Sequence, residues 1–576
     1  MNSEIQKSSR HTRNTAILPV ILFFWALASL IIPNAVLDIT DRYDWATATL
    51  NILLPVSAYA LLLTYRRRIG VAVVITLPLM IFGAFQLVLS YLYGEAIIAV
   101  DMFLNVATTN VEEVNELLGN LIYAIGAVVV LYLPPLIAGI IGIIKKWRLG
   151  ERFSQRARKL AIAGIGCSAI LTGIVTIRNS FGSLRHTLFP VNVVCNLAEA
   201  INRTVKTNHY EQTSAGFSHR ARSTRGACER EVYVMVIGET SRAINWQLAG
   251  YGRPTNPRLS EDPNLAFFSR SISESNTTHK SVPMLMSYLS AENFDSIYSS
   301  KSIISAMKEA GFHTYFYSNQ TANRSFTQFF GDEADEVRYT ELGRKPHPYD
   351  DELAAWLREA VADTTYAKQF FVLHTYGSHF LYKDRYPAEY TYFTPDNALD
   401  ANRANRESLI NGYDNSIRYT DGMLADVIGA LRTVDGRAAM VYSADHGEDI
   451  FDDERNRFLH ASPNPTYYQL HVASLAWMND SLASNRPDYA ASLTQNAGKP
   501  VSPQKSLFPT MLEMAGVSTP LLHREHSLVD SAYRYEGPVY LTDVNHCVPL
   551  HEAGIKESDR KKIDTLIRRH DLSLIH

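Results

Sequence analysis

The sequence predicts an α-helical membrane domain with five spans, followed by a large external α/β domain whose central sheet is mostly parallel. Three observations support this prediction. Long apolar stretches crowd the first third of the 576 residues, and basic residues concentrate in alternate loops between them. After residue 230, short β-branched or aromatic runs alternate with helical segments. The net charge of −3 gives no reason to expect a nucleic-acid partner.

Each apolar stretch is close to the ~20 residues that cross a bilayer core. Five such runs cannot all lie inside one small globule, and the first is too long, and too soon followed by others, to be a signal peptide. The predicted spans are Ala16–Leu37, Ala46–Tyr65, Ile69–Tyr93, Asn120–Ile144 and Leu160–Ile177.

The basic loops precede span one, join spans two and three, and join spans four and five. Because Lys and Arg mark cytoplasmic loops, an odd number of spans places everything after Arg178 outside the cytoplasm. We therefore predict a membrane domain (1–177), a linking helical segment with a linker (178–230) and an external domain (231–576).

Four runs in the external domain are predicted strands: "EVYVMVI", "FHTYFYS", "QFFVLHTY" and "AAMVYSA". Polar residues follow each run, namely Glu239, the stretch "SNQTANR", His379, and Asp445 with His446. Each residue alone is most simply a cap or a loop residue. Because sites in open α/β sheets form at the carboxyl ends of the strands, the four together predict a site.

Carboxylate oxygens and imidazoles make up this set, with His460 as a further candidate. Such donors suit zinc or a similar divalent ion with an open position, and they exclude a thiolate-type structural site. A nucleophile is available in "ESNTTHKSVPMLMSYLS", where a Thr pair precedes a predicted helix. A hydroxyl there would meet the positive end of the helix dipole, although Thr277 or Thr278 could instead cap the helix.

These motifs resemble those of the phosphoethanolamine transferases, inner-membrane enzymes of the alkaline phosphatase/sulfatase superfamily that include lipid A-modifying enzymes associated with polymyxin resistance. The resemblance covers nearly the whole chain. The matching motifs are Gly238-Glu239-Thr240, Thr278-His279-Lys280-Ser281-Val282-Pro283, Gly377-Ser378-His379, Ala444-Asp445-His446-Gly447-Glu448, "FLHASPN" with His460, and Tyr413-Asp414-Asn415 with Tyr419-Thr420-Asp421.

The resemblance implies a sulfatase-like external domain and one tight zinc site, with a second metal left open. It gives the metal ligands as Glu239, Thr278, Asp445 and His446, and the catalytic residues as Thr278, His379 and His460. Thr278 would be the nucleophile. His379 and His460 would face the phosphate as binders, proton donors or ligands of a second metal.

Asn105, Thr109 and Glu113 stand at i, i+4 and i+8 in an acidic external loop, which places them on one helix face. A solvated helix face would explain this spacing equally well. The resemblance instead implies that the three residues hold the ethanolamine headgroup of the donor lipid.

The implied function is transfer of phosphoethanolamine from phosphatidylethanolamine to lipopolysaccharide, with a lipid A phosphate as the first choice of acceptor. A core sugar or a periplasmic glucan is the alternative acceptor. A metal-dependent phosphohydrolase and a non-enzymatic membrane sensor are the alternative functions. The expected setting is a monomer among lipids of the bacterial inner membrane, with the catalytic domain in the periplasm and no nucleic-acid partner.

The chain departs from the family pattern at several positions. Glu274 and Met284 occupy the places of a cysteine pair that brackets the nucleophile, so packing or polar contacts must hold that loop. Ser378 replaces the usual Asn, and only Asn323 or Arg324 could match a family lysine near the phosphate. Among Cys195, Cys228 and Cys547, the sequence does not choose a disulfide pair.

Overall fold

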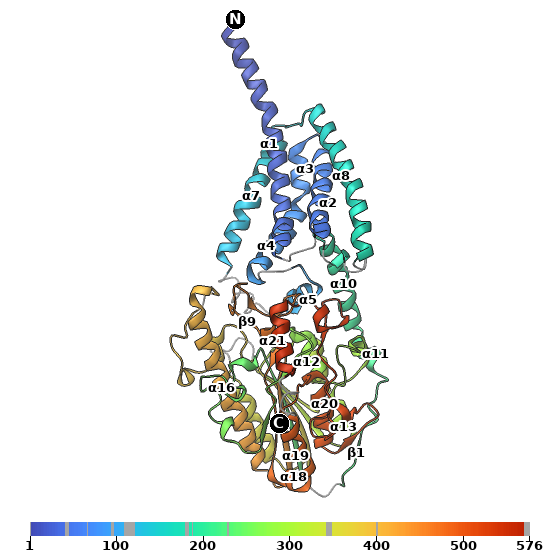
Figure 1. Ribbon diagram of the computed structural model, residues 1–576, viewed down its shortest axis with the longest axis vertical. Coiled ribbons are helices and arrows are strands. Elements are labelled where there is room, and N and C mark those ends of the chain that lie inside the picture. The colour runs from blue at the N-terminus through green and yellow to red at the C-terminus, as the bar shows by residue number, and fades with distance from the viewer. Residues whose placement is uncertain are drawn as a thin grey trace. The chain divides into compact units, whose positions relative to one another are not determined.

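The computed structural model describes residues 2–40, 45–65, 67–93, 97–108, 121–178, 184–186, 188–226, 230–340, 348–398 and 401–568. The chain forms two compact units, one made of Met1–Leu104 and Glu113–Asn202 and the other of Asn105–Glu112 and Arg203–His576. The predicted boundaries at 177 and 230 stay a prediction. The first unit is helical, and the second is an α/β unit (Figure 1).

The helices of the first part of the chain are α1 (Asn2–Thr40), α2 (Trp45–Thr64), α3 (Ile69–Ile75), α4 (Leu77–Tyr93), α5 (Val100–Thr108), α7 (Ile122–Ile144), α8 (Glu151–Arg178) and α10 (Val191–Asn208). Among the described residues, α1, α2, α7 and α8 contain segments long and apolar enough to cross a membrane, and α3 with α4 make a fifth if that bent pair is one span. The predicted helical membrane domain is confirmed, and the chain is a multi-pass membrane protein.

The third predicted span is not one straight helix. It bends by 50° between α3 and α4, at Thr76. Pro78 follows two residues later, near the start of α4. Proline lacks a backbone N–H, and its ring clashes with the carbonyl four residues earlier. The helix is therefore interrupted just before Pro78.

Glycine allows α3 to pack closely on α7. A Cβ on Gly70 would lie 2.4 Å from the carbonyl oxygen of Gly139 and 2.6 Å from the backbone nitrogen of Ile143. Any larger residue would therefore push the two helices apart, which is why small residues favour close contacts between membrane helices.

A seven-stranded sheet forms the centre of the α/β unit, in the order β3-β12-β8-β2-β7-β5-β6. Strands β8, β2, β7, β5 and β6 are parallel. At one edge β12 pairs antiparallel with β8, and β3 pairs antiparallel with β12. The strands are β2 (Glu231–Gly238), β3 (Leu265–Phe267), β5 (His313–Ser318), β6 (Glu336–Tyr339), β7 (Lys368–His374), β8 (Arg437–Ala444) and β12 (Ser474–Met478). The predicted mostly parallel sheet is confirmed.

Helices cover both faces of the sheet, with α16 on one side and α13 and α20 on the other (Figure 1). Tyr233, Met235 and Ile237 belong to the large core cluster that includes residues of α13 and α20. The alternate residues of β2 are buried as well, as expected for a strand covered on both faces. The helices are α11 (Tyr210–Ser214), α12 (Thr278–Leu285), α13 (Ile303–Glu309), α14 (Phe326–Gly331), α15 (Asp351–Ala362), α16 (Arg406–Arg432), α17 (Tyr467–Leu470), α18 (Asp480–Asn485), α19 (Pro487–Asn496), α20 (Pro503–Met514) and α21 (Glu557–Arg568).

The polar stretch predicted as a linker carries structure of its own. Tyr210 in α11 is buried in the core cluster, and its hydroxyl donates to the carbonyl of Ser300 at 2.9 Å. Strand β1 (Arg222–Ser223) pairs antiparallel with β13 (Val517–Ser518). This stretch therefore packs on the α/β unit, because its few aromatic residues find apolar partners there.

Candidate functional site

The register of the sheet brings three strand ends level. Ile237 of β2 pairs with His374 of β7, and Gly238 pairs with Ala444 of β8. The residues that follow these strands therefore emerge side by side, including the buried Glu239 and Asp445. This is the edge where the sequence predicted a site.

In the part of the chain that the structure describes, the Glu239 carboxylate receives hydrogen bonds only from neutral groups. Oε1 accepts from the Thr240 hydroxyl at 2.6 Å, and Oε2 accepts from Gln320 Nε2 at 3.3 Å. The Thr278 hydroxyl lies 3.4 Å from Oε1. Burial, reinforced by the nearby Asp445, raises the pKa of Glu239 to about 7. The charged form of this carboxyl thus lacks a compensating cation within the described residues.

Asp445 and His446 face Glu239 from the next strand. Asp445 Oδ1 accepts from the backbone N–H groups of Thr240 (3.1 Å) and His446 (2.7 Å), while burial raises the pKa of Asp445 to about 7. His446 Nδ1 lies 2.9 Å from the carbonyl of Gly447 and donates to it, so Nε2 of the neutral ring is an acceptor. That Nε2 is 3.2 Å from Asp445 Oδ2 and 3.6 Å from Glu239 Oε1.

Thr278 begins α12, and Thr277 occupies the capping position without a side-chain capping bond. The Thr278 hydroxyl instead points to the cluster, 3.0 Å from His446 Nε2. Because Nε2 is an acceptor there, the hydroxyl donates to it. The simple capping role considered for this hydroxyl therefore does not describe its contacts.

His379 lies in the loop after β7, and this loop is tied to Glu239. Gly377 has φ +55°, and a Cβ there would lie 2.5 Å from the Glu239 carbonyl, so only glycine fits. Asp350 accepts the N–H of Gly377 at 2.9 Å. His379 Nδ1 donates to the carbonyl of Phe380 at 2.7 Å, and burial lowers the pKa of His379 to about 3.

His460 arrives from a different segment and completes the cluster. Its ring centroid lies 4.1 Å from that of His446 and 6.1 Å from that of His379. Burial lowers its pKa well below the ordinary value for histidine. The predicted metal ligands and catalytic residues of the external domain thus come together at one edge of the sheet.

The donor set fits a metal ion. Ligand atoms of Glu239, His446 and His460 lie within 4.8 Å of one another. Asp445 Oδ2 and the Thr278 hydroxyl adjoin the same His446 Nε2. These groups are acceptors apart from the hydroxyl, and the described residues place no Lys or Arg in an ion pair with either carboxylate. Carboxylate, imidazole and hydroxyl donors around such a point suit zinc.

Other residues singled out in the sequence are not part of this cluster or lie outside the described residues. Thr109 and Glu113 lie outside the described residues, as does the side chain of Asn105. Asn323 and Arg324 are exposed, and the hydrogen bonds they make stay within their own segment. Cys195 and Cys547 are free thiols, and Cys228 lies outside the described residues.

The sequence reasoning missed Gln320, which anchors Glu239. Its Nε2 also donates to the Thr375 carbonyl at 2.8 Å. The polar stretch "SNQTANR" marked the right strand end, but its six amide, hydroxyl and basic candidates could not be ranked without the β5–β7 register.

Glu274 replaces covalent closure of the nucleophile loop with hydrogen bonds. Buried Glu274 accepts the Ala291 N–H (2.7 Å) at Oε2 and the Ser502 hydroxyl (2.7 Å) at Oε1. Its own backbone N–H donates to Gln504 Oε1 at 3.2 Å. The polar contacts expected in place of the family disulfide are thus present.

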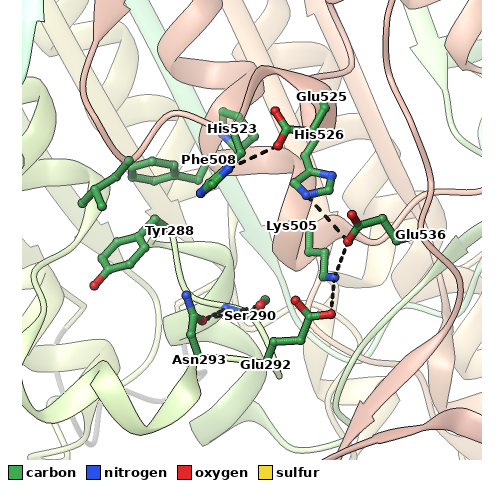
Figure 2. A pocket seen from close by; sticks show the side chains of 12 residues that line it. Tyr288, Ser290, Glu292, Asn293, Lys505, Phe508, His523, Glu525, His526 and Glu536 are labelled. Atoms are coloured by element: carbon green, nitrogen blue, oxygen red, sulfur yellow. Dashed lines mark hydrogen bonds and ion pairs between the residues drawn. The ribbon is translucent and has the colours of Figure 1, made fainter.

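A cavity of about 270 Å³ lies beyond this clamp (Figure 2). The Lys505 ammonium sits between Glu292 Oε1 (2.9 Å) and Glu536 Oε2 (3.1 Å), and His523 and His526 lie above them (Figure 2). None of the residues of the sheet-edge cluster lines this cavity, so it is a separate feature of the surface.

Residues 231–517 match the Sulfatase family model. This part of the chain is a sulfatase-family domain. Kdo(2)-lipid A phosphoethanolamine 7''-transferase from Escherichia coli (strain K12) is 31% identical over 261 residues, which cover 44% of this chain and 45% of the relative. The resemblance to phosphoethanolamine transferases is confirmed, although the chain spans only about half the length of the curated relatives it matches.

Solved structures share the fold of the sulfatase-family domain and of the helical region. Integral membrane lipooligosaccharide phosphoethanolamine transferase A (EptA) from Neisseria meningitidis has a TM-score of 0.66 at 20% identity, over 88% of this chain and 98% of that chain. The C-terminal periplasmic domain of EcEptC from Escherichia coli, in complex with Zn, has a TM-score of 0.52 at 24% identity, over 59% of this chain and 97% of that chain. At these identities the likeness establishes the fold.

Proposed function

We propose that this chain is a zinc-dependent transferase of the bacterial inner membrane. It moves phosphoethanolamine from phosphatidylethanolamine to a lipopolysaccharide acceptor, first of all a lipid A phosphate, through a phosphoethanolamine–Thr278 intermediate. The curated relatives named as phosphoethanolamine transferases support the class of reaction. The site supports the assignment of residues.

One observation carries the proposal: the Thr278 hydroxyl stands at a helix start, within 3.5 Å of His446 Nε2 and both oxygens of Glu239. A threonine hydroxyl in such a place can act as a nucleophile when a base and positive charge adjoin it. Threonine also argues against a sulfatase, because that class needs a modified Cys or Ser.

Glu239, Thr278, Asp445 and His446 would hold the zinc ion, with His460 alongside. The related EcEptC domain solved in complex with Zn is consistent with this choice. When bound, zinc would supply positive charge that favours the alkoxide of Thr278 and offsets charge on the phosphate oxygens. Histidine and carboxylate donors of this kind leave an open position for substrate.

In the first half-reaction, Thr278 Oγ1 forms a bond to phosphorus and the bond from phosphorus to the diacylglycerol oxygen breaks. The Thr278 hydroxyl gives up its proton and the departing diacylglycerol oxygen takes one up, so the step balances and diacylglycerol leaves as an alcohol.

In the second half-reaction, an oxygen of the acceptor attacks phosphorus and the bond to Thr278 Oγ1 breaks. The Nδ1–H of His379 is engaged by the Phe380 carbonyl, so the lone pair on Nε2 would take the proton of the acceptor. That proton then returns to the Thr278 oxygen, which restores the hydroxyl.

The membrane domain would present the donor lipid. Asn105, Thr109 and Glu113 would bind the ethanolamine amine, which is a role for the carboxylate and polar groups of that loop. Both substrates would be confined with the enzyme to one membrane, which raises their effective concentration.

The proposed orientation places the sulfatase-family domain in the periplasm. A reporter fused after Lys159 is expected to lie in the cytoplasm, and one fused after Arg178 in the periplasm. If both reporters lie on the same side, the last span and the proposed location are wrong.

The decisive experiment separates the two half-reactions. Full-length protein incubated with a phosphatidylethanolamine analogue and no acceptor should retain phosphoethanolamine on Thr278 and release one diacylglycerol per site. Thr278→Ala should lose both the adduct and the release, whereas Thr278→Ser should keep a small part of each. Peptide mapping by mass spectrometry locates the adduct.

Further variants assign the remaining roles. His379→Ala should slow transfer to the acceptor by on the order of 10²–10⁴-fold while adduct formation continues. Glu113→Gln should weaken use of the donor lipid instead. Transfer without any adduct would show direct displacement and contradict the role of Thr278. Mass spectrometry of lipid A from cells with and without the protein identifies the acceptor.

A further inference from the structure

Glu448 is a buried carboxylate that none of the steps above employs. It is fully buried at the end of the segment that carries Asp445 and His446. Among the described residues, no Lys or Arg side chain pairs with it. The nearby Arg242 pairs with Asp452 at 2.7 Å and reaches only the main-chain carbonyl of Glu448.

Within the described ranges, two side chains engage this carboxylate, one on each oxygen. The Tyr382 hydroxyl donates to Oε1. His460 Nδ1 lies 3.5 Å from Oε2. The second contact reaches the catalytic cluster directly, because His460 is one of the three residues whose ligand atoms converge there.

The direction of this contact defines what His460 offers to the site. The ionised form of Glu448 can only accept, and opposite it Nδ1 of His460 carries the proton while the lone pair of the neutral ring lies on Nε2. Carboxylates that hold histidine in this way fix both the tautomer and the plane of the ring. Tyr382 in turn holds the Glu448 carboxylate from the other side.

We propose that Glu448, oriented by Tyr382, is the positioning residue for His460, and that it turns His460 Nε2 toward the metal and the phosphate. The inference rests on the proposed function for its activity readout only. The proposal itself is that Glu448 and His460 are energetically coupled, so that substitutions of the two residues have non-additive effects on zinc affinity.

A double-mutant cycle on full-length protein tests this coupling. Glu448→Met, which keeps the length of the side chain but not its acceptor oxygens, is combined with His460→Ala. Two quantities are measured: diacylglycerol release from phosphatidylethanolamine, and zinc affinity by competition with a chelator of known affinity. Each single variant is expected to lower both by on the order of 10–100-fold.

The coupling is read from the double variant. If Glu448 acts through His460, Glu448→Met costs less than about twofold once His460 is alanine, since the two changes are then not additive. Glu448→Gln should retain most of both quantities, because its amide oxygen can still accept from Nδ1. Tyr382→Phe should fall between the parent protein and Glu448→Met.

Asp449→Asn is the matched control. Asp449 is the next residue, is equally buried, and hydrogen-bonds Thr466 and Gln469 rather than a histidine. The fold-losses caused by Asp449→Asn and by His460→Ala should therefore multiply in the double variant, as for two independent sites. Additive effects of Glu448→Met and His460→Ala on zinc affinity, or unchanged zinc affinity in both, would overturn the inference. A parent protein that releases no diacylglycerol, but shows the coupling in zinc affinity, would refute the proposed function and leave the inference standing.

Discussion

The two ends of strand β2 carry the same chemical group in opposite circumstances. Glu231 opens the strand and Glu239 follows its last residue, and both side chains are buried. Around Glu231 the chain places Arg225 at 3.3 Å, Lys368 at 3.7 Å and Arg437 at 3.8 Å. Around Glu239 the described residues place hydroxyls, an amide and imidazole, and no Lys or Arg.

This difference separates a structural charge from a functional one. Burying a carboxylate is costly unless an opposite charge compensates it. At Glu231 the compensation is built into the fold. At Glu239 and Asp445 it is absent, and the raised pKa of each carboxyl records the cost. A site prepared in this way is suited to a cation supplied from outside the chain.

The largest effect is expected on activity, from removal of either buried carboxylate of the site. Glu239→Ala and Asp445→Ala should each lower kcat by on the order of 10³-fold or more, because the several kcal/mol that a metal contributes to the transition state is lost. Diacylglycerol release from a phosphatidylethanolamine analogue measures it, with membrane insertion and thermal unfolding as controls for folding. Full activity in a metal-free preparation would contradict the role given to zinc.

The same isosteric change should have opposite effects on stability at the two ends. In chelator-treated protein at pH 8, Glu231→Gln should lower the free energy of unfolding by about 3–5 kcal/mol, since it leaves buried cations unpaired. Glu239→Gln should raise it by about 1–3 kcal/mol, since it removes an uncompensated charge. Thermal unfolding in detergent compares the two variants with the parent.

The pH dependence gives the sign of the Glu239 effect. Its pKa is about 7 in the folded protein against an ordinary value of 4.5, so ionisation favours the unfolded chain above that range. The gain from Glu239→Gln should therefore be full above pH 7 and shrink as the pH falls toward 4.5. A gain that does not change with pH would show that another interaction is responsible.

Zinc should raise the free energy of unfolding through Glu239 and not through Glu231. At a free zinc concentration 100 times Kd, the parent should gain about 2.7 kcal/mol, seen as a higher unfolding temperature than in chelator. Glu231→Gln should keep this gain despite its lower starting stability. Glu239→Gln should lose most of it, and equal gains in the two variants would place the metal elsewhere.

The smallest effect concerns Glu274, a third buried carboxylate, which neutral donors satisfy. Glu274→Ala should lower the free energy of unfolding by about 1–3 kcal/mol, because it leaves the Ala291 N–H and the Ser502 hydroxyl without their acceptor. Treatment of the parent with a thiol reductant should leave activity unchanged. Loss of activity under reductant would show that a disulfide, rather than this clamp, supports the loop.

Much of the architecture could be read from the sequence because it depends on local patterns. Apolar length identified the four long membrane helices and the bent pair α3 and α4 among the described residues, and alternating runs identified four strands of the sheet. Even the bend of the third span has a local cause, since Pro78 cannot continue the hydrogen bonds of α3. The strand-end motifs also placed Glu239, Asp445 and His446 at one edge, because parallel strands end together.

Only the tertiary structure decided which side chains touch within that edge. Gln320 and Glu448 contact Glu239 and His460 across 81 and 12 residues of sequence, and the choice depends on strand register and loop path. Glu274 could be seen to replace a cysteine, but its partners lie 17 and 228 residues away. The same limit applies to the two ends of β2: the sequence shows a glutamate at each, whereas only the packing of distant cations around Glu231 makes one structural and leaves the other open to a metal.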